Sequence, residues 1–399
     1  MLIEKCGLTP SALQGKTIIL TGGGGGIGLE TTRALVWLGA NVIIAEIDAD
    51  KGKTAADTAN HDTSSARAES YIIDLSDEMQ IQALVRYAQQ KYGFVDAVIN
   101  NAAYVAVGAV EDVAAPVWDK SYAVNFRAPL RLAQLLLPDM KTKDSGAILF
   151  VSSSGAAPYM GAYEVFKTSQ VELSNTLAAE LDDTKVHAFT IGPGLVKTET
   201  AMNGIEKIAA LMGMSTEAFY QMNEKHMLSA EEAGTGFALA VVFAEKYRGQ
   251  EISSIQALSD AGLYSGNAEE TEKKETSASD GAELAALIPQ AADTYFEQYE
   301  GWLKRNLFER QWVLRDFKKY AGYSAEQFKA RIEDARKLAQ HGDFGCLAAF
   351  QGDFMKLAEY YRHQYKLLQG FEKDPKKLKE NLAVIEGWID VAERIVGLL

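Results

Sequence analysis

Tyr163 and Lys167 are the residues whose types and spacing most directly suggest chemistry. They lie four residues apart in Tyr163–Leu181, a stretch with a helical pattern, so both side chains can address the same ligand. A free tyrosine is a poor base because its pKa is about 10. A neighbouring ammonium should stabilise the phenolate and lower that pKa, which would let the phenolate take a proton from a hydroxyl group. The same spacing is common between surface neighbours, so the pair needs support from its context.

Hydroxyl and amide side chains follow several apolar runs of this sequence. The run Ala147–Val151 ends in Ser152, Ser153 and Ser154, and a hydroxyl at this place can hydrogen-bond the oxygen of a substrate. Polar segments also follow two other apolar runs. Asn100-Asn101-Ala102-Ala103 follows Ala97–Ile99, and the loop from Gly192 to Thr198 follows Val186–Ile191. In an open parallel sheet, ligands bind outside the carboxyl ends of the strands, which is where these segments are expected. Asn125 is expected within the helix after the fourth strand.

A glycine-rich segment, Thr21–Gly28, joins the apolar run Thr17–Leu20 to the helical pattern Leu29–Leu38. A turn without side chains lets backbone N–H groups approach a pyrophosphate at a helix N-terminus. The spacing GxGxxG fits Gly23, Gly25 and Gly28, and the spacing TGxxxGxG fits Thr21, Gly22, Gly26 and Gly28. The segment therefore predicts a dinucleotide site and leaves both registers open.

Glu46 follows the second predicted strand, Asn41–Ala45. A carboxylate there can accept hydrogen bonds from the ribose hydroxyls of NAD and repels a 2′-phosphate. The nearest basic residues, Lys51 and Lys53, are expected to start the next helix. The sequence thus favours NAD over NADP. Asp48 and Asp50 compete with Glu46 for this role. The alternative is that Glu46 is only a solvated acid of the loop.

The elements that must position these groups form an α/β pattern over residues 1–265. Short apolar runs rich in Ile and Val alternate with amphipathic stretches, which predicts a doubly wound parallel sheet of about seven strands with helices on both faces. Its seven runs are Thr17–Leu20, Asn41–Ala45, Tyr71–Ile73, Ala97–Ile99, Ala147–Val151, Val186–Ile191 and a weaker Glu251–Leu258. Trp118–Met140 is among the predicted helices.

The rest of the chain has a different pattern. Residues 266–282 are polar and rich in Ser and Thr, which predicts a linker. Residues 283–399 contain long amphipathic segments and predict an all-α domain of three or four helices, one of them beginning at Asp374-Pro375. Aromatic residues such as Tyr295, Trp302 and Tyr360 are expected to form its own core, although a subunit interface or a cap over the active site stays open.

Composition narrows the functional classes. The 399 residues carry a net charge of −14, so nucleic acid and anionic membrane surfaces are poor partners. Cys6 and Cys346 form no CxxC pattern, which predicts no disulfide framework and no metal site and fits the cytoplasm. No run of 18 apolar residues and no secretory signal is recognised, so a membrane span and secretion are not expected.

Residues from about Leu13 to Leu263 resemble a short-chain dehydrogenase/reductase with an NAD(P)-binding Rossmann fold. The resemblance is carried by TGxxxGIG at Thr21–Gly28, the NNAA segment, the serine cluster, YxxxK at Tyr163–Lys167 and PGxVxT at Pro193–Thr198. It implies a catalytic tetrad of Asn125, Ser153, Tyr163 and Lys167, in which Asn125 holds a water of a proton relay. The cofactor-binding residues that it implies are Gly22, Gly26, Ile27, Gly28, Glu46, Asp74, Leu75, Asn100, Ala102, Tyr163, Lys167, Pro193, Val196 and Thr198.

Two departures from the family pattern bear on this site. Ser153 and Tyr163 are only ten residues apart, and Ser152 or Ser154 could take the place of Ser153. Glu164 follows the tyrosine where small residues are common, and it is expected to point to solvent.

The expected function is that of an NAD-dependent oxidoreductase that interconverts a secondary alcohol and a ketone, with Tyr163 as acid/base. An NAD-assisted epimerase or dehydratase and a non-catalytic NAD-binding scaffold are the alternatives. A lid at Glu199–Leu228 carries several methionines, and Tyr104, Tyr159 and Met160 are further candidates for pocket walls. These residues favour a neutral, largely apolar substrate, and the alternative is that the lid residues only pack on the sheet. The resemblance also implies a homo-oligomer.

Overall fold

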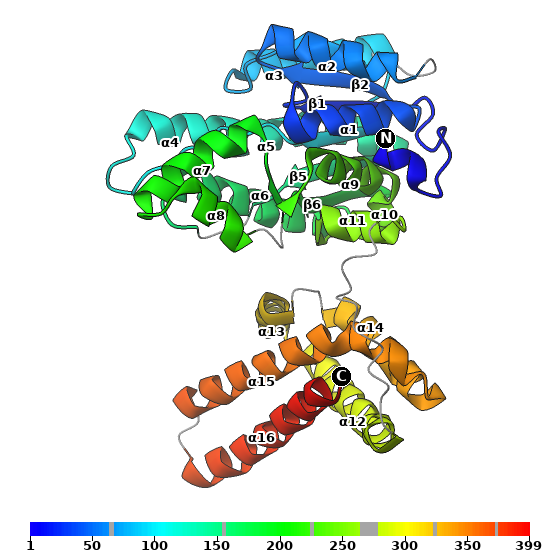
Figure 1. The fold of residues 1–399 in the computed structure, drawn as a ribbon, viewed down its shortest axis with the longest axis vertical. Helices are drawn as coiled ribbons and strands as arrows, with labels where there is room; N and C mark the ends of the chain where they lie inside the picture. Colours follow the sequence, from blue (N-terminus) through cyan, green and yellow to red (C-terminus); the bar gives the residue numbers. More distant parts are fainter. Residues whose placement is uncertain (64–67, 154–156, 224–226, 264–277, 322–324, 372–373) are drawn as a thin grey trace. The chain divides into compact units, whose positions relative to one another are not determined.

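The computed structural model describes residues 1–63, 68–153, 157–223, 227–263, 278–321, 325–371 and 374–399. The chain divides into two compact units, Met1–Gly266 and Asn267–Leu399 (Figure 1). The predicted linker 266–282 falls mostly outside the described residues. Its last five residues belong to a helix that begins at Ala278, so the helical part starts earlier than predicted.

The first unit is built on a seven-stranded sheet in which every neighbouring pair is parallel. In spatial order its strands are β3 (Ala68–Ile72), β2 (Asn41–Glu46), β1 (Thr17–Thr21), β4 (Ala97–Asn100), β5 (Gly146–Val151), β6 (Val186–Gly192) and β9 (Glu251–Ser253). The strand order reverses between β1 and β4, and a crevice for a dinucleotide opens at such a switch point. The predicted doubly wound α/β fold is confirmed.

The helices of this unit follow the strands along the chain (Figure 1). They are η1 (Leu2–Lys5), α1 (Gly26–Trp37), α2 (Ala49–His61), α3 (Glu78–Tyr92), α4 (Ala115–Tyr122), the π-helical η2 (Ala123–Arg127), α5 (Ala128–Lys143), α6 (Gly161–Glu180), α7 (Glu199–Leu211), α8 (Thr216–Asn223), α9 (Ala230–Val242), α10 (Ala244–Tyr247) and α11 (Ser254–Asp260). A short separate sheet pairs β7 (Leu195–Val196) with β8 (Met227–Leu228).

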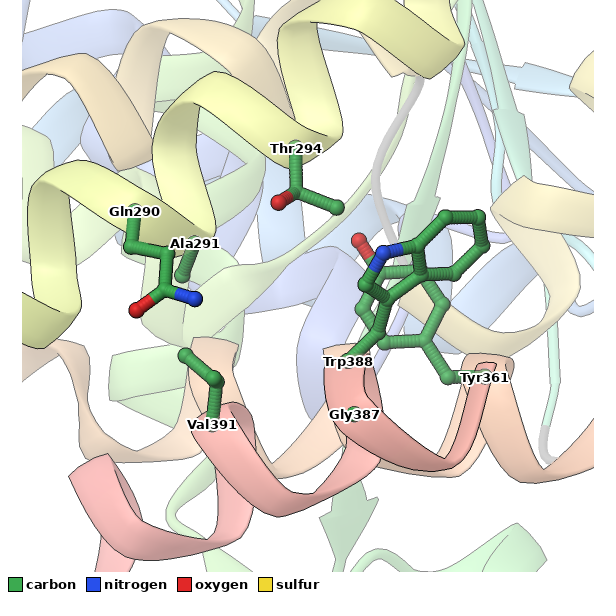
Figure 2. A pocket seen from close by; sticks show the side chains of 7 residues that line it. All are labelled: Gln290, Ala291, Thr294, Tyr361, Gly387, Trp388 and Val391. Atoms are coloured by element: carbon green, nitrogen blue, oxygen red, sulfur yellow. The ribbon is translucent and has the colours of Figure 1, made fainter. Parts of the chain in front are cut away.

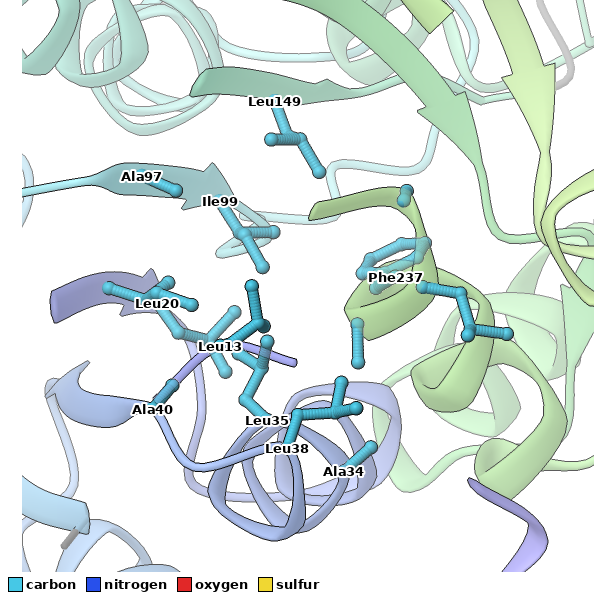
Figure 3. Packing of buried hydrophobic residues seen from close by; sticks show 14 of the residues in the cluster. Leu13, Leu20, Ala34, Leu35, Leu38, Ala40, Ala97, Ile99, Leu149 and Phe237 are labelled. Atoms are coloured by element: carbon cyan, nitrogen blue, oxygen red, sulfur yellow. The ribbon is translucent and has the colours of Figure 1, made fainter. Parts of the chain in front are cut away.

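The sheet is held by two apolar layers, one on each face. Successive side chains of a strand point to opposite faces, so Ile18 and Leu20 pack against α1 and α9 while Ile19 packs against α3 and α5. Figure 3 shows the first layer, where Leu35 and Phe237 meet the side chains of the central strands. Each fully buried aliphatic side chain contributes about 1.5–3 kcal/mol, so these layers keep the strand ends at the site rigid.

Several predicted elements of the first unit have different bounds in the structure. The third strand begins at Ala68 and not at Tyr71. The seventh predicted strand, Glu251–Leu258, ends at Ser253, because the Ser253 side chain accepts a hydrogen bond from the Gln256 N–H and starts α11. The predicted helix Trp118–Met140 is interrupted by the π-helical η2, which carries Asn125.

The second unit is all helical, as predicted. Its elements are α12 (Ala278–Leu303), α13 (Leu307–Ala321), α14 (Ala325–His341), η4 (Phe344–Phe350), α15 (Gln351–Phe371) and α16 (Pro375–Leu398). The described residues thus form five α-helices, more than the three or four predicted. One reason is a break before α13, where the Asn306 side chain accepts a hydrogen bond from the Glu309 N–H. The helix start at Asp374-Pro375 is confirmed, since Asp374 caps the Lys376 and Lys377 N–H groups.

Aromatic side chains form the core of the second unit. Tyr295, Trp302 and Tyr360 are buried in one cluster with Phe317 and Phe328, so the expectation of a self-contained core is confirmed for them. A cavity of about 170 Å³ lies between α12, α15 and α16 (Figure 2). It is lined by Gln290, Ala291, Thr294, Tyr361, Gly387, Trp388 and Val391. It exists partly because Gly387 places no side chain there.

Candidate active site

The glycine segment forms a tight turn between β1 and α1. Gly22 and Gly26 have φ angles of 66° and 51°, a left-handed backbone that glycine adopts without strain. A Cβ on Gly28 would lie 2.1 Å from the Gly22 carbonyl oxygen, and a Cβ on Gly22 would lie 2.8 Å from the Ala102 Cα. These positions therefore exclude side chains for reasons of space as well as conformation.

Gly25 differs from the other glycines of this turn. It is the N-cap of α1, and a Cβ built on it would have no atom of the described chain within 4 Å. Free space thus lies beside Gly25 at the N-terminus of α1, near the switch point of the sheet. A pyrophosphate fits such a cradle, because helix N-termini offer N–H donors and a positive dipole end.

Glu46 ends β2 directly beside this turn. Its Oε2 accepts a hydrogen bond from the Gly24 N–H at 3.0 Å, and its Oε1 accepts hydrogen bonds from the N–H groups of Ile47 and Asp48. The carboxylate is thereby fixed next to the glycine turn. An ionised carboxylate has about four lone-pair sites, so it keeps capacity for a ribose hydroxyl.

The segments after β4 and β6 meet the glycine turn. The Asn101 side chain donates to the carbonyl oxygens of Thr21 and Gly22, and the Ala102 N–H donates to Thr21 Oγ1. Asn100 is buried; its Nδ2 donates to the Leu149 carbonyl, and its Oδ1 has no partner among the described residues. Several predicted cofactor residues are therefore neighbours in space.

The loop after β6 reaches the other side of the turn. Thr198 Cγ2 would lie 2.8 Å from a Cβ on Gly26, and Thr198 caps α7 by accepting from the Ala201 N–H. Val196 packs in a small apolar cluster with Ile27. Pro193 is partly exposed at the start of this loop.

Asp74 and Leu75 follow β3, the strand beyond β2. Asp74 accepts a hydrogen bond from the Ser76 N–H at 2.8 Å, and Leu75 is buried. No described hydrogen bond links either residue to the glycine turn, so their predicted place around the adenine rests on the strand order alone.

Ser153, Tyr163 and Lys167 come together where β5 ends. Tyr163 and Lys167 lie one turn apart on α6, and the Lys167 Nζ is 5.8 Å from the centroid of the Tyr163 ring. The Lys167 Nζ donates to the Val151 carbonyl at 2.9 Å. A side-chain hydrogen bond between Ser153 and Tyr163 lowers the pKa of Tyr163, which identifies Ser153 as the serine beside the phenol. Ser152 is buried, and Ser154 lies outside the described residues.

Glu164 corrects one sequence prediction. It was expected to point to solvent, but it is only 4% exposed, and its Oε1 accepts a hydrogen bond from Ser153 Oγ at 2.7 Å. The fold buries it because α6 begins at Gly161, which places Glu164 in the first turn opposite the end of β5. An acid in the first turn of a helix is also favoured by the helix dipole.

The pKa of Tyr163 is a second correction. Burial raises it above the ordinary value, the charge of Glu164 raises it further, and the hydrogen bond with Ser153 opposes both. The predicted lowering by Lys167 is not found. Lys167 is itself buried, and burial lowers its pKa to about 8 while Glu164 opposes that shift. The protein groups around Tyr163 therefore favour the neutral phenol.

Asn125 sits in the π-helical turn beside α6. Its side chain donates to the Tyr104 carbonyl and to Ser121 Oγ, each at 2.8 Å, and accepts from the Tyr104 N–H at 2.9 Å. The backbone carbonyl oxygen of Asn125 accepts a hydrogen bond from the Gln170 side chain of α6. Asn125 thus ties the loop after β4 to the helix of Tyr163, and π-helical turns of this kind are frequent at functional sites.

Comparisons with known proteins agree with this geometry. A family model described as short chain dehydrogenase matches residues 16–209. The D-beta-hydroxybutyrate dehydrogenase of Cupriavidus necator is 34% identical over 209 residues, which cover 51% of this chain and 80% of that protein.

Two solved structures share the fold at low identity. NAD⁺-bound xylitol dehydrogenase aligns with a TM-score of 0.56 and 21% identity over 60% of this chain and 98% of that one. L-Sorbose reductase from Gluconobacter frateurii, in complex with NADPH and L-sorbose, aligns with a TM-score of 0.55 and 23% identity over 61% and 97%. These two likenesses show the fold. The matching family model and the relative establish that this chain belongs to the short-chain dehydrogenase family.

Proposed function

We propose that this protein is an NAD-dependent oxidoreductase that interconverts a secondary alcohol and a ketone, with Tyr163 as general acid/base. The observation that carries the proposal is the meeting of Ser153, Tyr163 and Lys167 at the end of β5. They lie at the same edge of the sheet as the glycine turn.

Each residue of the cluster has a distinct task. In the reducing direction the neutral phenol of Tyr163 donates its proton to the carbonyl oxygen, and in the oxidising direction the phenolate takes the proton of the hydroxyl. Bound NAD supplies the hydride acceptor, and NADH supplies the hydride donor. Because burial raises the pKa of Tyr163, alcohol oxidation needs added positive charge near the phenol, and Lys167 is placed to provide part of it.

Glu46 supports NAD as the cofactor. Its carboxylate lies where a 2′-phosphate would bring negative charge, and the nearby bases already have acidic partners. Lys51 pairs with Glu199, and Lys53 pairs with Asp57. The likeness to solved structures leaves this choice open, because one of them holds NAD⁺ and another NADPH.

The lid favours a substrate that is largely apolar. Met202 of α7 and Met212 at its end are 42% and 39% exposed, so their thioethers are accessible to a ligand. The name of the relative from Cupriavidus necator indicates a hydroxy acid, which brings a negative charge. A charged short hydroxy acid is therefore the competing substrate class.

A screen for NADH formation tests the proposal. Secondary alcohols are offered with NAD⁺, and ketones with NADH, while absorbance is followed. Net turnover of added cofactor supports the oxidoreductase. An epimerase gives product without net cofactor turnover, and a scaffold binds NAD without giving product, so either outcome replaces the proposal.

We also propose a homo-oligomer and a cytoplasmic location. Tyr122 and Val165, 40% and 51% exposed, adjoin an aromatic group of Trp118, Phe126 and Phe166 that a second copy could cover. Light scattering on purified protein measures the oligomeric state. Both cysteines are free, which is typical of a reducing compartment. Among the described residues, no helix is long and apolar enough to cross a bilayer.

A further inference from the structure

The carboxylate of Glu164 lies inside the cluster that performs the proposed reaction. It is nine-tenths or more buried and shares a hydrogen bond of 2.7 Å with Ser153, the hydroxyl next to Tyr163. A buried carboxylate acts over a longer range than an exposed one because solvent screens it less. Its charge is therefore part of the environment of any substrate oxygen bound there.

Glu164 also competes for the single proton of Ser153. An ionised carboxylate only accepts hydrogen bonds, so Ser153 must be the donor in this contact. While Ser153 donates to Glu164, it has no proton for the phenolate of Tyr163 or for a substrate oxygen. A ligand group that neutralises Glu164 or donates to it releases the Ser153 hydroxyl for that work.

Distance decides which part of a substrate meets this charge. An oxygen bound to Ser153 at an ordinary hydrogen-bond length of about 2.8 Å lies within about 6 Å of the Glu164 carboxylate. Substituents one or two bonds from the reacting carbon then lie within about 10 Å of this carboxylate, which is a range over which a poorly screened charge still acts. A negative substituent there is repelled, and an ammonium is attracted.

We propose that Glu164 is a specificity-determining residue, which selects against substrates with a carboxylate beside the reacting carbon and in favour of those with an ammonium there. This inference rests on the proposed alcohol oxidation and deepens it, since it assigns the charge of the preferred substrate. Glu164 acts beside the reacting atoms and takes no proton from the substrate.

The test compares three alcohols of one design, CH₃–CH(OH)–CH₂–X. The group X is a carboxylate in 3-hydroxybutyrate, an ethyl group in 2-pentanol and an aminomethyl group in 4-amino-2-butanol. kcat/KM with NAD⁺ is measured for the wild type and for Glu164→Gln, which keeps the shape and removes the charge. Glu172→Gln is the matched control, because Glu172 is an exposed acid on the same helix.

The wild type should prefer the amine to the neutral alcohol and the neutral alcohol to the acid. Glu164→Gln should raise the ratio of acid to amine at least tenfold, while Glu172→Gln leaves it within about twofold. An equal change for all three substrates in Glu164→Gln overturns the proposal, because a purely structural role would act in that way. Should Glu164→Gln fail to fold, Glu164→Ala takes its place.

A second measurement does not depend on the substrate. The phenolate absorbance of Tyr163 is titrated as the difference between each protein and its Tyr163→Phe variant. The apparent pKa of Tyr163 should fall in Glu164→Gln, and an unchanged value overturns the proposal. If the wild type gives no NADH with any of the three alcohols while this titration shifts, the proposed function fails and the electrostatic coupling of Glu164 to Tyr163 stands.

Discussion

The Lys167 ammonium lies over the ring of Tyr163, 5.8 Å from its centroid, and both residues are on α6. The arrangement places a cation where a phenolate would form, at the cost of burying that cation. Burial lowers the pKa of Lys167 to about 8, so this residue serves the proposed chemistry and disfavours folding.

Lys167→Met should abolish turnover and stabilise the fold at pH 7. The unfolded chain holds the Lys167 proton up to its ordinary pKa of 10.5, whereas the folded chain releases it near 8. The penalty is therefore complete below about pH 8 and disappears as the pH rises towards 10.5. We expect the free energy of unfolding in urea to rise by about 1–3 kcal/mol at pH 7, partly offset by the lost hydrogen bond to Val151.

The gain in the free energy of unfolding from Lys167→Met should be smaller at pH 10 than at pH 7 in the same urea titrations. A variant that is less stable than the wild type at pH 7, or a gain that grows with pH, contradicts the role of burial.

Gly25 and Gly28 should respond differently to alanine. Gly28→Ala places a Cβ 2.1 Å from the Gly22 oxygen and should destabilise the turn, which a lower melting temperature would show. Gly25→Ala has free space and an extended backbone, so its melting temperature should match the wild type. Its affinity for NAD should fall at least tenfold, because the new methyl group occupies the pyrophosphate cradle. If calorimetry gives Gly25→Ala the same affinity for NAD as the wild type, the pyrophosphate binds elsewhere.

Glu46→Ser should relax the choice of cofactor. Removing the carboxylate beside the Gly24 N–H removes the repulsion of a 2′-phosphate, so the ratio of kcat/KM for NADP to that for NAD should rise about tenfold or more. Asp50→Asn is the control, because Asp50 is an exposed competitor of Glu46 on α2. If Asp50→Asn changes the ratio of NADP to NAD use and Glu46→Ser does not, Asp50 is the acid that discriminates between the two cofactors.

Gly387→Ala should stabilise the second unit. A Cβ on Gly387 would meet no described atom within 4 Å, because the residue borders the cavity between α12, α15 and α16. Alanine is favoured over glycine inside a helix by about 0.5–1 kcal/mol, and calorimetry of the full chain should show a gain of that size. Gly397→Ala, in the last turn of α16, is the control and should gain less. Destabilisation by Gly387→Ala would mean that the methyl group clashes where the structure leaves room.

Local sequence predicted most of the first unit, and the exceptions share a cause. Continuous runs of Ile and Val, as in Asn41–Ala45, predicted the buried strands. The position of the glycine segment between a strand and a helix predicted the turn. The burial of Glu164 could not be predicted, because it depends on how the Ser153 side chain at the end of β5 meets the first turn of α6. Sequence spacing shows that two residues share a helix, but it does not show which polar group meets them from another element.

Small polar contacts also decided the ends of elements. The seventh strand stops at Ser253 because a side-chain cap starts α11 at the next residue, inside the run Glu251–Leu258 that was predicted as a strand. The π-helical turn at Asn125 has no distinctive composition, and the hydrogen bonds of Asn125 with Tyr104 and Gln170 come from other elements. Asn101, whose side chain holds the glycine turn, had a sequence signal in the NNAA segment, but only the structure shows what it binds.

The most direct test of the central claim is the turnover of Tyr163→Phe. Removing the hydroxyl takes away the group that donates and accepts the proton and leaves the glycine turn intact. Affinity for NAD should stay within about twofold of the wild type, while kcat for the best alcohol falls by about a thousandfold or more. Turnover by Tyr163→Phe at a rate near that of the wild type would contradict the assignment of Tyr163 as the acid/base.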